Sequence, residues 1–277
     1  MPTVDLKITN GKLVIPGVGI VEGGVAVDDG KIVAIGKDAN LPKADEEVDA
    51  GGNPVIPGVI DPHEHMGIFH DLGEEAESKT RSALAGGTTT VGCFVAGEQS
   101  YFKTMDETIE TFEDNILTDL FAHLVIGTNQ QLDEITGYAD EYGVSSFKFY
   151  MCGIPNLIPC EDEDFWLRGF NEVAKVSPEA YACVHAENSS IVYAARERVI
   201  KEKPDGNLED WAETHPDYAE ELAINTAARL SNIAGNKLYI VHVSTRKGIE
   251  EARRVKDRYG NIFVETTSPY LTIARAR

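Results

Sequence analysis

The sequence has little positive charge for its length: 25 Lys and Arg residues stand against 46 Asp and Glu residues, for a net charge of −21. This deficit argues against nucleic acid or an anionic membrane surface as a partner, because both attract clustered cations. No run of about 18 apolar residues occurs, so no membrane span is expected. The N-terminus has neither a basic nor an apolar segment, so no secretory signal is expected.

Cysteine is also scarce. The four cysteines are Cys93, Cys152, Cys160 and Cys183, and they form no Cys-x-x-Cys motif. Cys93 and Cys183 lie inside strand-like runs and are interpreted as small core residues. Nothing in this pattern resembles a disulfide framework, so we expect a reduced, cytoplasmic protein.

Short β segments rich in Val and Ile fill residues 1–53 of the 277-residue chain. Asn10-Gly11 and Asp29-Gly30 separate these segments, and both dipeptides favour tight hairpin turns. We therefore predict a small antiparallel sheet that forms a portion of a β-sandwich. Because so few strands bury little apolar surface, this sheet is expected to need strands from elsewhere.

Strand-like runs alternate with helical patterns from residue 54 to residue 277. The runs are 55–60, 88–95, 121–126, 146–151, 181–185, 237–243 and 262–266. Each is nearly continuous in Val, Ile, Phe, Tyr and Thr, which is typical of parallel strands buried on both faces. Repeated β-α units predict an α/β fold, specifically a (β/α)8 barrel of the TIM type. An open doubly wound sheet is the alternative, but the sequence lacks a phosphate-binding glycine loop after an early strand.

A closed (β/α)8 barrel needs eight strands, and the sequence contains seven such runs. The sequence ends at Arg277, shortly after the seventh run, so the eighth strand is missing from it. We expect a barrel that is incomplete at the C-terminus and has two unpaired edges. Our hypothesis is that the chain is a fragment or an early-terminated gene product.

Histidines mark the expected C-terminal ends of three strands, where the active sites of α/β barrels lie. They are His63, His65, His185 and His242. His63 and His65 are two residues apart, so their side chains leave the strand on one face. The pair alone is equally compatible with two hydrogen-bonded polar residues in a loop. Together the four imidazoles predict a metal site. The remaining histidines, His70, His123 and His215, are interpreted as non-ligands.

Lys148 is flanked by Phe147 and Phe149 in a run that is expected to be buried. Burying a charged lysine is costly, and desolvation favours its neutral amine. A neutral amine can add carbon dioxide to become a carbamate, which is a carboxylate able to bridge two divalent metals. The alternative is a lysine whose ammonium group reaches solvent at the barrel mouth. Beside a histidine cluster we favour the carbamate.

The chain resembles the amidohydrolase superfamily, in particular the branch of the dihydropyrimidinases, hydantoinases, allantoinases and dihydroorotases. The resemblance covers essentially the whole chain. The segments that carry it are 56–66 (IPGVIDPHEHM), 85–91 (AGGTTTV), 146–149 (SFKF), 184–188 (VHAEN), 238–244 (LYIVHVS) and 265–271 (ETTSPYL).

This resemblance implies a centre of two divalent metal ions, usually Zn2+, with Mn2+ or Fe2+ as alternatives. His63 and His65 would bind one ion, His185 and His242 the other, and N6-carboxylated Lys148 would bridge them. The implied activity is that of a cyclic amidohydrolase, in which a metal-bridging hydroxide opens the C–N bond of a small hydantoin, dihydropyrimidine or ureide-like ring. A homo-oligomer is also implied.

Three departures from the family pattern bear on the activity. The family's acid–base aspartate on strand eight is absent, so no catalytic residue is assigned. Gly153 replaces the tyrosine that binds substrate five residues after the lysine, and Tyr150, on the same face as Lys148, is the candidate substitute. Gly67 replaces an arginine found in dihydroorotases, which favours the hydantoinase side.

Two other functions remain open. One is a dihydroorotase- or allantoinase-type hydrolase, and the other is an inactive truncated or scaffold homologue. A scaffold protein has no evident need for the four histidines and Lys148, so their presence favours an enzyme.

Overall fold

A computed structural model describes residues 3–153 and 162–273. The chain divides into two compact units, Met1–Val59 and Ile60–Arg277. No helix in the described ranges is both long and apolar enough to cross a membrane.

The smaller unit is a mixed sheet. Its strands are β1 (Val4–Ile15), β2 (Gly19–Asp28), β3 (Lys31–Gly36), β4 (Ala44–Asp49) and β5 (Pro54–Val55). The strand order is β3-β2-β1-β4, and β5 also pairs with β1. The β1–β2 and β2–β3 pairs are antiparallel, as predicted, but β4 and β5 run parallel to β1. The prediction of a purely antiparallel sheet is therefore wrong.

Only one of the two predicted hairpin turns forms in this sheet. Asp29 and Gly30, with φ of 49° and 68°, link β2 to β3 as expected for a tight hairpin. At Asn10-Gly11 the chain does not turn: β1 continues, and its register against β2 shifts just before Gly11. Asn10 has a φ of 53°, and its backbone N–H donates to Asp38 Oδ2 at 2.9 Å. The dipeptide thus forms a bulge, because tertiary contacts hold it in place.

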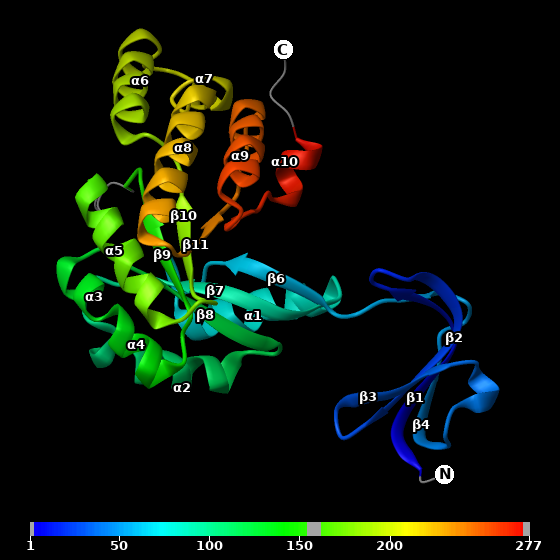
Figure 1. Ribbon diagram of the computed structural model, residues 1–277. Coiled ribbons are helices and arrows are strands. Elements are labelled where there is room, and N and C mark those ends of the chain that lie inside the picture. The colour runs from blue at the N-terminus through cyan, green and yellow to red at the C-terminus, as the bar shows by residue number, and fades with distance from the viewer. Residues whose placement is uncertain (1–2, 154–161, 274–277) are drawn as a thin grey trace. The chain divides into compact units, whose positions relative to one another are not determined.

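The larger unit contains a seven-stranded sheet in which neighbours along the chain are neighbours in space (Figure 1). Its strands are β6 (Val59–Glu64), β7 (Thr88–Val95), β8 (Asp119–Val125), β9 (Ser146–Tyr150), β10 (Tyr181–His185), β11 (Lys237–Ile240) and β12 (Ile262–Val264). The pairings from β7 to β12 are all parallel. The strand order never reverses, which excludes the doubly wound alternative, whose order reverses at a switch point.

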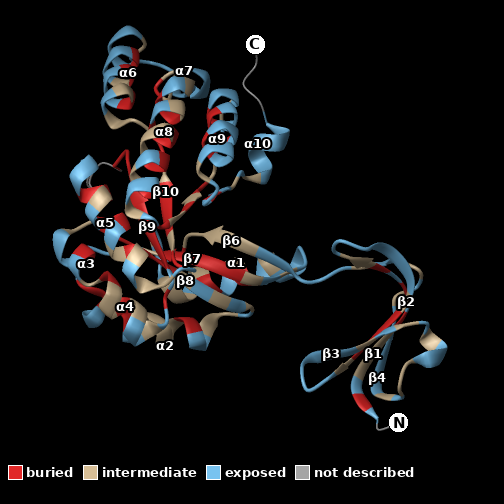
Figure 2. Ribbon diagram, in the orientation of Figure 1, coloured by how far each residue is buried: buried red, intermediate tan, exposed pale blue. Residues whose placement is uncertain are grey.

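Helices connect these strands, and several of them pack against one another. The helices are α1 (Leu72–Ala85), α2 (Met105–Asn115), α3 (Asn129–Asp133), α4 (Ile135–Tyr142), α5 (Glu163–Val176), α6 (Ser189–Glu202), α7 (Leu208–Ala212), α8 (Asp217–Ala234), α9 (Arg246–Tyr259) and α10 (Ser268–Thr272), with a 3-10 turn, η2 (Tyr101–Lys103). Contacts join α1 to α2, α4 to α5, α5 to α8 and α8 to α9. Buried residues concentrate on the central strands of this sheet, whereas β6 and β12 at its edges are mostly intermediate or exposed (Figure 2).

The sheet buries both of its faces in the centre. On β9, Phe147 and Phe149 belong to the large core between sheet and helices. The alternate residue Tyr150 belongs to a separate cluster that includes Phe94 and Cys183. This alternation places Lys148 on the face away from the helices, as the two-residue period of a strand requires.

The first predicted strand of this unit, 55–60, is wrong. β5 ends at Val55 and β6 begins at Val59, and the exposed fractions of Ile56 and Ile60 are 57% and 62%. Pro57 has no N–H to donate to a sheet, which interrupts the run. The shift matters for the site, because His63 now lies within β6 rather than after it.

Candidate metal centre

The four predicted histidines lie together at one end of the parallel sheet. His63 is on β6, His65 directly follows it, His185 is the last residue of β10, and His242 lies two residues beyond β11. The Nε2 atoms of His63 and His65 are 3.2 Å apart, and His185 Nδ1 is 3.1 Å from His242 Nε2. The ring centroids of His63 and His242 are 5.3 Å apart, so the two pairs form one cluster.

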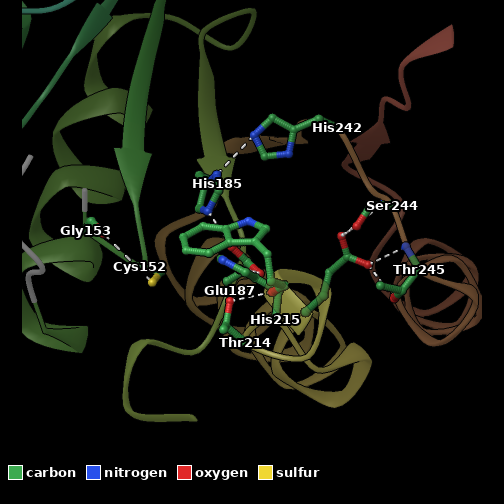
Figure 3. A network of polar contacts seen from close by, with 11 residues as sticks. Cys152, Gly153, His185, Glu187, Thr214, His215, His242, Ser244 and Thr245 are labelled. Atoms are coloured by element: carbon green, nitrogen blue, oxygen red, sulfur yellow. Dashed lines mark hydrogen bonds and ion pairs between the residues drawn. The ribbon is translucent and has the colours of Figure 1, made fainter. Parts of the chain in front are cut away.

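An unusual backbone conformation aims His242 at this cluster. Its φ of 41° lies in the left-handed region, which is costly for a residue with a side chain. The sheet hydrogen bonds on either side are intact: Val241 N–H donates to Val184 O and Val243 N–H donates to Glu265 O. The backbone therefore changes direction at His242 itself. As a result, the ring of His242 faces His185 (Figure 3).

The ring of Phe94 packs against the rings of His63 and His65, which form the first histidine pair. Its buried ring lies 4.5 Å from the His63 ring centroid and 4.3 Å from that of His123, on which it stacks. The ring nitrogens of His123 lie 2.6 Å from Ser146 Oγ and 3.1 Å from Pro62 O. Both nitrogens of His123 thus have protein partners, and the latter contact ties β8 to the strand that carries His63.

Lys148 is completely buried, and its Nζ has no hydrogen-bond partner among the described residues. Nζ lies 4.6 Å from the ring centroid of Phe94 and 5.1 Å from that of Tyr150. Burial lowers the pKa of Lys148 from 10.5 to about 7. A large fraction of the amine is therefore neutral near pH 7, which is the form that adds carbon dioxide.

Burial and neighbouring charges lower the pKa values of two of the four histidines. Burial, followed by the charges of His63 and Lys148, lowers the pKa of His65 to about 4. Burial, followed by the charges of His185 and Lys148, lowers the pKa of His242 to about 2. Both imidazoles are therefore neutral at pH 7 and have a lone pair to offer a metal.

The donor set fits two divalent ions only when Lys148 contributes. Within residues 3–153 and 162–273, no group of three or more His, Cys, Asp or Glu side chains is placed to hold a metal ion. Each histidine pair offers two nitrogens, one fewer than the three protein ligands typical of catalytic zinc sites. A carboxylated Lys148 would supply the additional oxygen donors, and its Nζ has no hydrogen-bond partner among the described residues, so the residues present fit a shared lysine carbamate.

Two carboxylates, which no sequence pattern assigned to the site, contact one histidine of each pair. Both oxygens of Glu265, just after β12, lie 3.1 Å from His63 Nδ1. Glu187 Oε2 lies 2.9 Å from His185 Nε2. Both glutamates are in the segments that carry the resemblance, but Glu265 is 202 residues from its histidine. No local pattern reveals such a contact.

His215 contacts Glu187, and its position in the sequence, before a helix, did not predict this contact. Its Nδ1 is 2.8 Å from Glu187 Oε1 (Figure 3). Burial raises the pKa of Glu187, but hydrogen bonds from His185 and His215 outweigh it and lower the pKa to about 2. Glu187 is therefore ionised at neutral pH.

A cavity of about 430 Å3 opens beside the second histidine pair. Glu187, Trp211, His215, Ser244 and Tyr270 are among the residues that line it. Its dimensions are in the range of small-molecule sites. Tyr150, the candidate substrate-binding residue, does not line this cavity; its ring stacks on that of His185, with centroids 5.4 Å apart.

Comparisons with known proteins show that the chain is similar to hydantoinases and allantoinases. The chain is 29% identical to a D-hydantoinase of Geobacillus stearothermophilus over 279 residues, 96% of this chain and 57% of the relative. It is 32% identical to an allantoinase of Rubrobacter xylanophilus over 286 residues, 98% of this chain and 59% of the relative. The solved L-hydantoinase (dihydropyrimidinase) from Arthrobacter aurescens superposes with a TM-score of 0.88 at 28% identity, covering 98% of this chain and 60% of that one. No family model matches. The chain thus spans 57–60% of the length of these relatives.

Proposed function

Because this chain is a relative of the hydantoinases, allantoinases and dihydropyrimidinases within the amidohydrolase superfamily, we propose that it carries the metal-binding part of a cyclic amide hydrolase. The substrate would be a small ring of the hydantoin, dihydropyrimidine or ureide type. In that reaction water adds to a ring carbonyl carbon, the ring C–N bond breaks, and the released nitrogen takes up a proton.

One observation supports this proposal above the others: a buried lysine with a pKa of about 7, whose Nζ has no hydrogen-bond partner among the described residues, lies beside two pairs of histidines. His63 and His65 would hold one divalent ion, His185 and His242 would hold the other, and carboxylated Lys148 would contact both. Such ions lower the pKa of a bound water to near 7 and polarise a carbonyl group. The protein's own contribution is to bring the four imidazoles together and to keep those of His65 and His242 neutral.

The same relationship supports two proposals about architecture. The seven-stranded sheet would be part of a (β/α)8 barrel, and residues 1–53 would be part of a small β-sandwich domain. Four expectations stay predictions: zinc as the metal, a cytoplasmic location, a homo-oligomeric state and a substrate-binding role for Tyr150.

Metal analysis of the purified chain tests the proposal directly. We expect about two divalent ions per chain after growth with zinc or manganese, and we expect bicarbonate to promote loading because the carbamate forms from carbon dioxide. His63→Asn and His242→Asn should each lower the metal content, whereas His70→Asn, a change of an exposed histidine, should not. A chain that binds no metal with or without bicarbonate refutes the proposal.

Ring opening is then measured with hydantoin, dihydrouracil and allantoin as substrates, by chromatography of the carbamoyl products. Lys148→Met should abolish any activity, because it removes the shared ligand. Turnover that persists in this variant, or that is unaffected by a chelator, contradicts the assignment of the site.

A further inference from the structure

A chain of hydrogen bonds leads from the second histidine pair to the cavity. His185 Nε2 lies 2.9 Å from Glu187 Oε2, and Glu187 Oε1 lies 2.8 Å from His215 Nδ1. Figure 3 shows these three side chains in sequence, with His242 on the far side of His185. The two oxygens of one carboxylate thus contact two histidines, one from the centre and one from the cavity wall.

The chemistry of the carboxylate decides the proton positions. Each carboxylate oxygen of Glu187 lies within hydrogen-bond distance of one imidazole nitrogen, and a nitrogen that donates to a carboxylate oxygen carries the hydrogen. His185 therefore has its proton on Nε2, and its Nδ1 presents a lone pair toward His242 Nε2, 3.1 Å away. This is the tautomer that a metal-binding imidazole needs.

Burial makes the second contact of Glu187 important. The side chain of Glu187 is only 19% exposed, so an oxygen without a partner would be poorly solvated. His215 supplies that partner, and its own ring is held in turn: its centroid lies 5.5 Å from that of Trp211. Pro216, the next residue, caps α8 and restricts the backbone at His215.

We propose that Glu187 and His215 are a positioning pair for His185: Glu187 fixes its tautomer and ring orientation, and His215 holds Glu187 in place. The consequence for metal affinity rests on the proposed function of His185 as a ligand. The tautomer assignment does not rest on it, and the two parts are tested separately.

The first test uses the metal-free chain and nuclear magnetic resonance. With 15N-labelled histidine, the two nitrogens of His185 give distinct shifts that identify the protonated one, and His185→Asn provides the assignment. We expect the Nε2–H tautomer in the parent and a mixture of tautomers in Glu187→Gln. The Nδ1–H tautomer in the parent, or no change in Glu187→Gln, overturns the proposal whether or not the chain binds metal.

The second test measures the affinity for Co2+ by its visible absorption after chelator treatment. Glu187→Gln should weaken the second site about 10- to 100-fold, the range for loss of a partner behind a metal ligand. His215→Phe should weaken it about 3- to 10-fold, because it removes one hydrogen bond from Glu187. His215→Asn keeps a donor near the Nδ1 position and should restore most of the affinity.

Combining the changes separates an indirect role from a direct one. If His215 acts through Glu187, adding His215→Phe to Glu187→Gln should cause no further loss. Multiplicative losses overturn the assignment of His215, and an unchanged affinity in Glu187→Gln overturns that of Glu187. Matched controls are His70→Asn and Glu209→Gln, both exposed, and circular dichroism confirms folding of every variant. If the parent binds no Co2+ yet shows the expected tautomer, the proposed function fails while the positioning pair stands.

Discussion

Replacing Lys148 with methionine should make the metal-free protein more stable while it removes a ligand of the proposed metal centre. Lys148 is fully buried, and its Nζ has no hydrogen-bond partner among the described residues. A lysine with a pKa of about 7 in the folded chain and 10.5 as its ordinary value must lose its proton to stay buried. Methionine has a similar length and no charge, so it fills the same space without that cost.

The size of the effect follows from the pKa. Each pKa unit corresponds to about 1.4 kcal/mol, so the lysine destabilises the folded chain by about 4 to 5 kcal/mol at pH 7. Between pH 7 and 10.5 the unfolded chain binds more protons at this residue than the folded chain. The free energy of unfolding of the parent therefore rises with pH relative to the variant, and the difference should shrink to about 2 kcal/mol at pH 9.

Urea unfolding of chelator-treated, bicarbonate-free protein measures this difference. Tryptophan fluorescence reports on the larger unit alone, because both tryptophans, Trp166 and Trp211, lie in it. Lys175→Met is the matched control: its side chain is 60% exposed in a surface ion pair, and the change should cost at most about 1 kcal/mol. A Lys148→Met variant that is less stable than the parent, or a difference that does not vary with pH, would refute a buried neutral lysine.

Three further changes test the surroundings of the site. Glu265→Gln should weaken Co2+ binding about 10- to 100-fold, and an unchanged titration would exclude an orienting role for this carboxylate. Tyr101→Phe should lower the free energy of unfolding in urea by about 1 to 3 kcal/mol, because the buried hydroxyl lies 2.7 Å from Val125 O; a neutral result would mean that water replaces it. Gly169→Ala should lower the thermal midpoint and cost about 1 to 3 kcal/mol, since the new Cβ would lie 2.3 Å from a ring carbon of Phe149. An unshifted midpoint would show that the ring moves freely.

Sequence patterns predicted the larger unit better than the smaller one. Continuous β-branched and aromatic runs predict buried parallel strands, and such a run at Thr88–Val95 forms β7 with the same bounds. The pattern failed where the backbone or contacts with distant residues overrode the preference of the local sequence. Asn10-Gly11 favours a turn, yet Asp38 and the neighbouring strands hold it as a bulge. The apolar run 55–60 favours a strand, yet Pro57 interrupts it.

The sequence by itself predicted the four histidines and the lysine of the site, but not Glu187, Glu265 or His215. Residue type and strand period alone place four imidazoles and one lysine at the same end of a parallel sheet, because all parallel strands end on one edge. The tertiary structure decided how those groups behave. It buries Lys148 where no described residue is a hydrogen-bond partner of its Nζ, gives His242 a left-handed backbone conformation, and brings Glu187 and His215 into contact next to His185. Protonation and ring orientation depend on burial and on contacts between residues far apart in the chain, so no local pattern contains them.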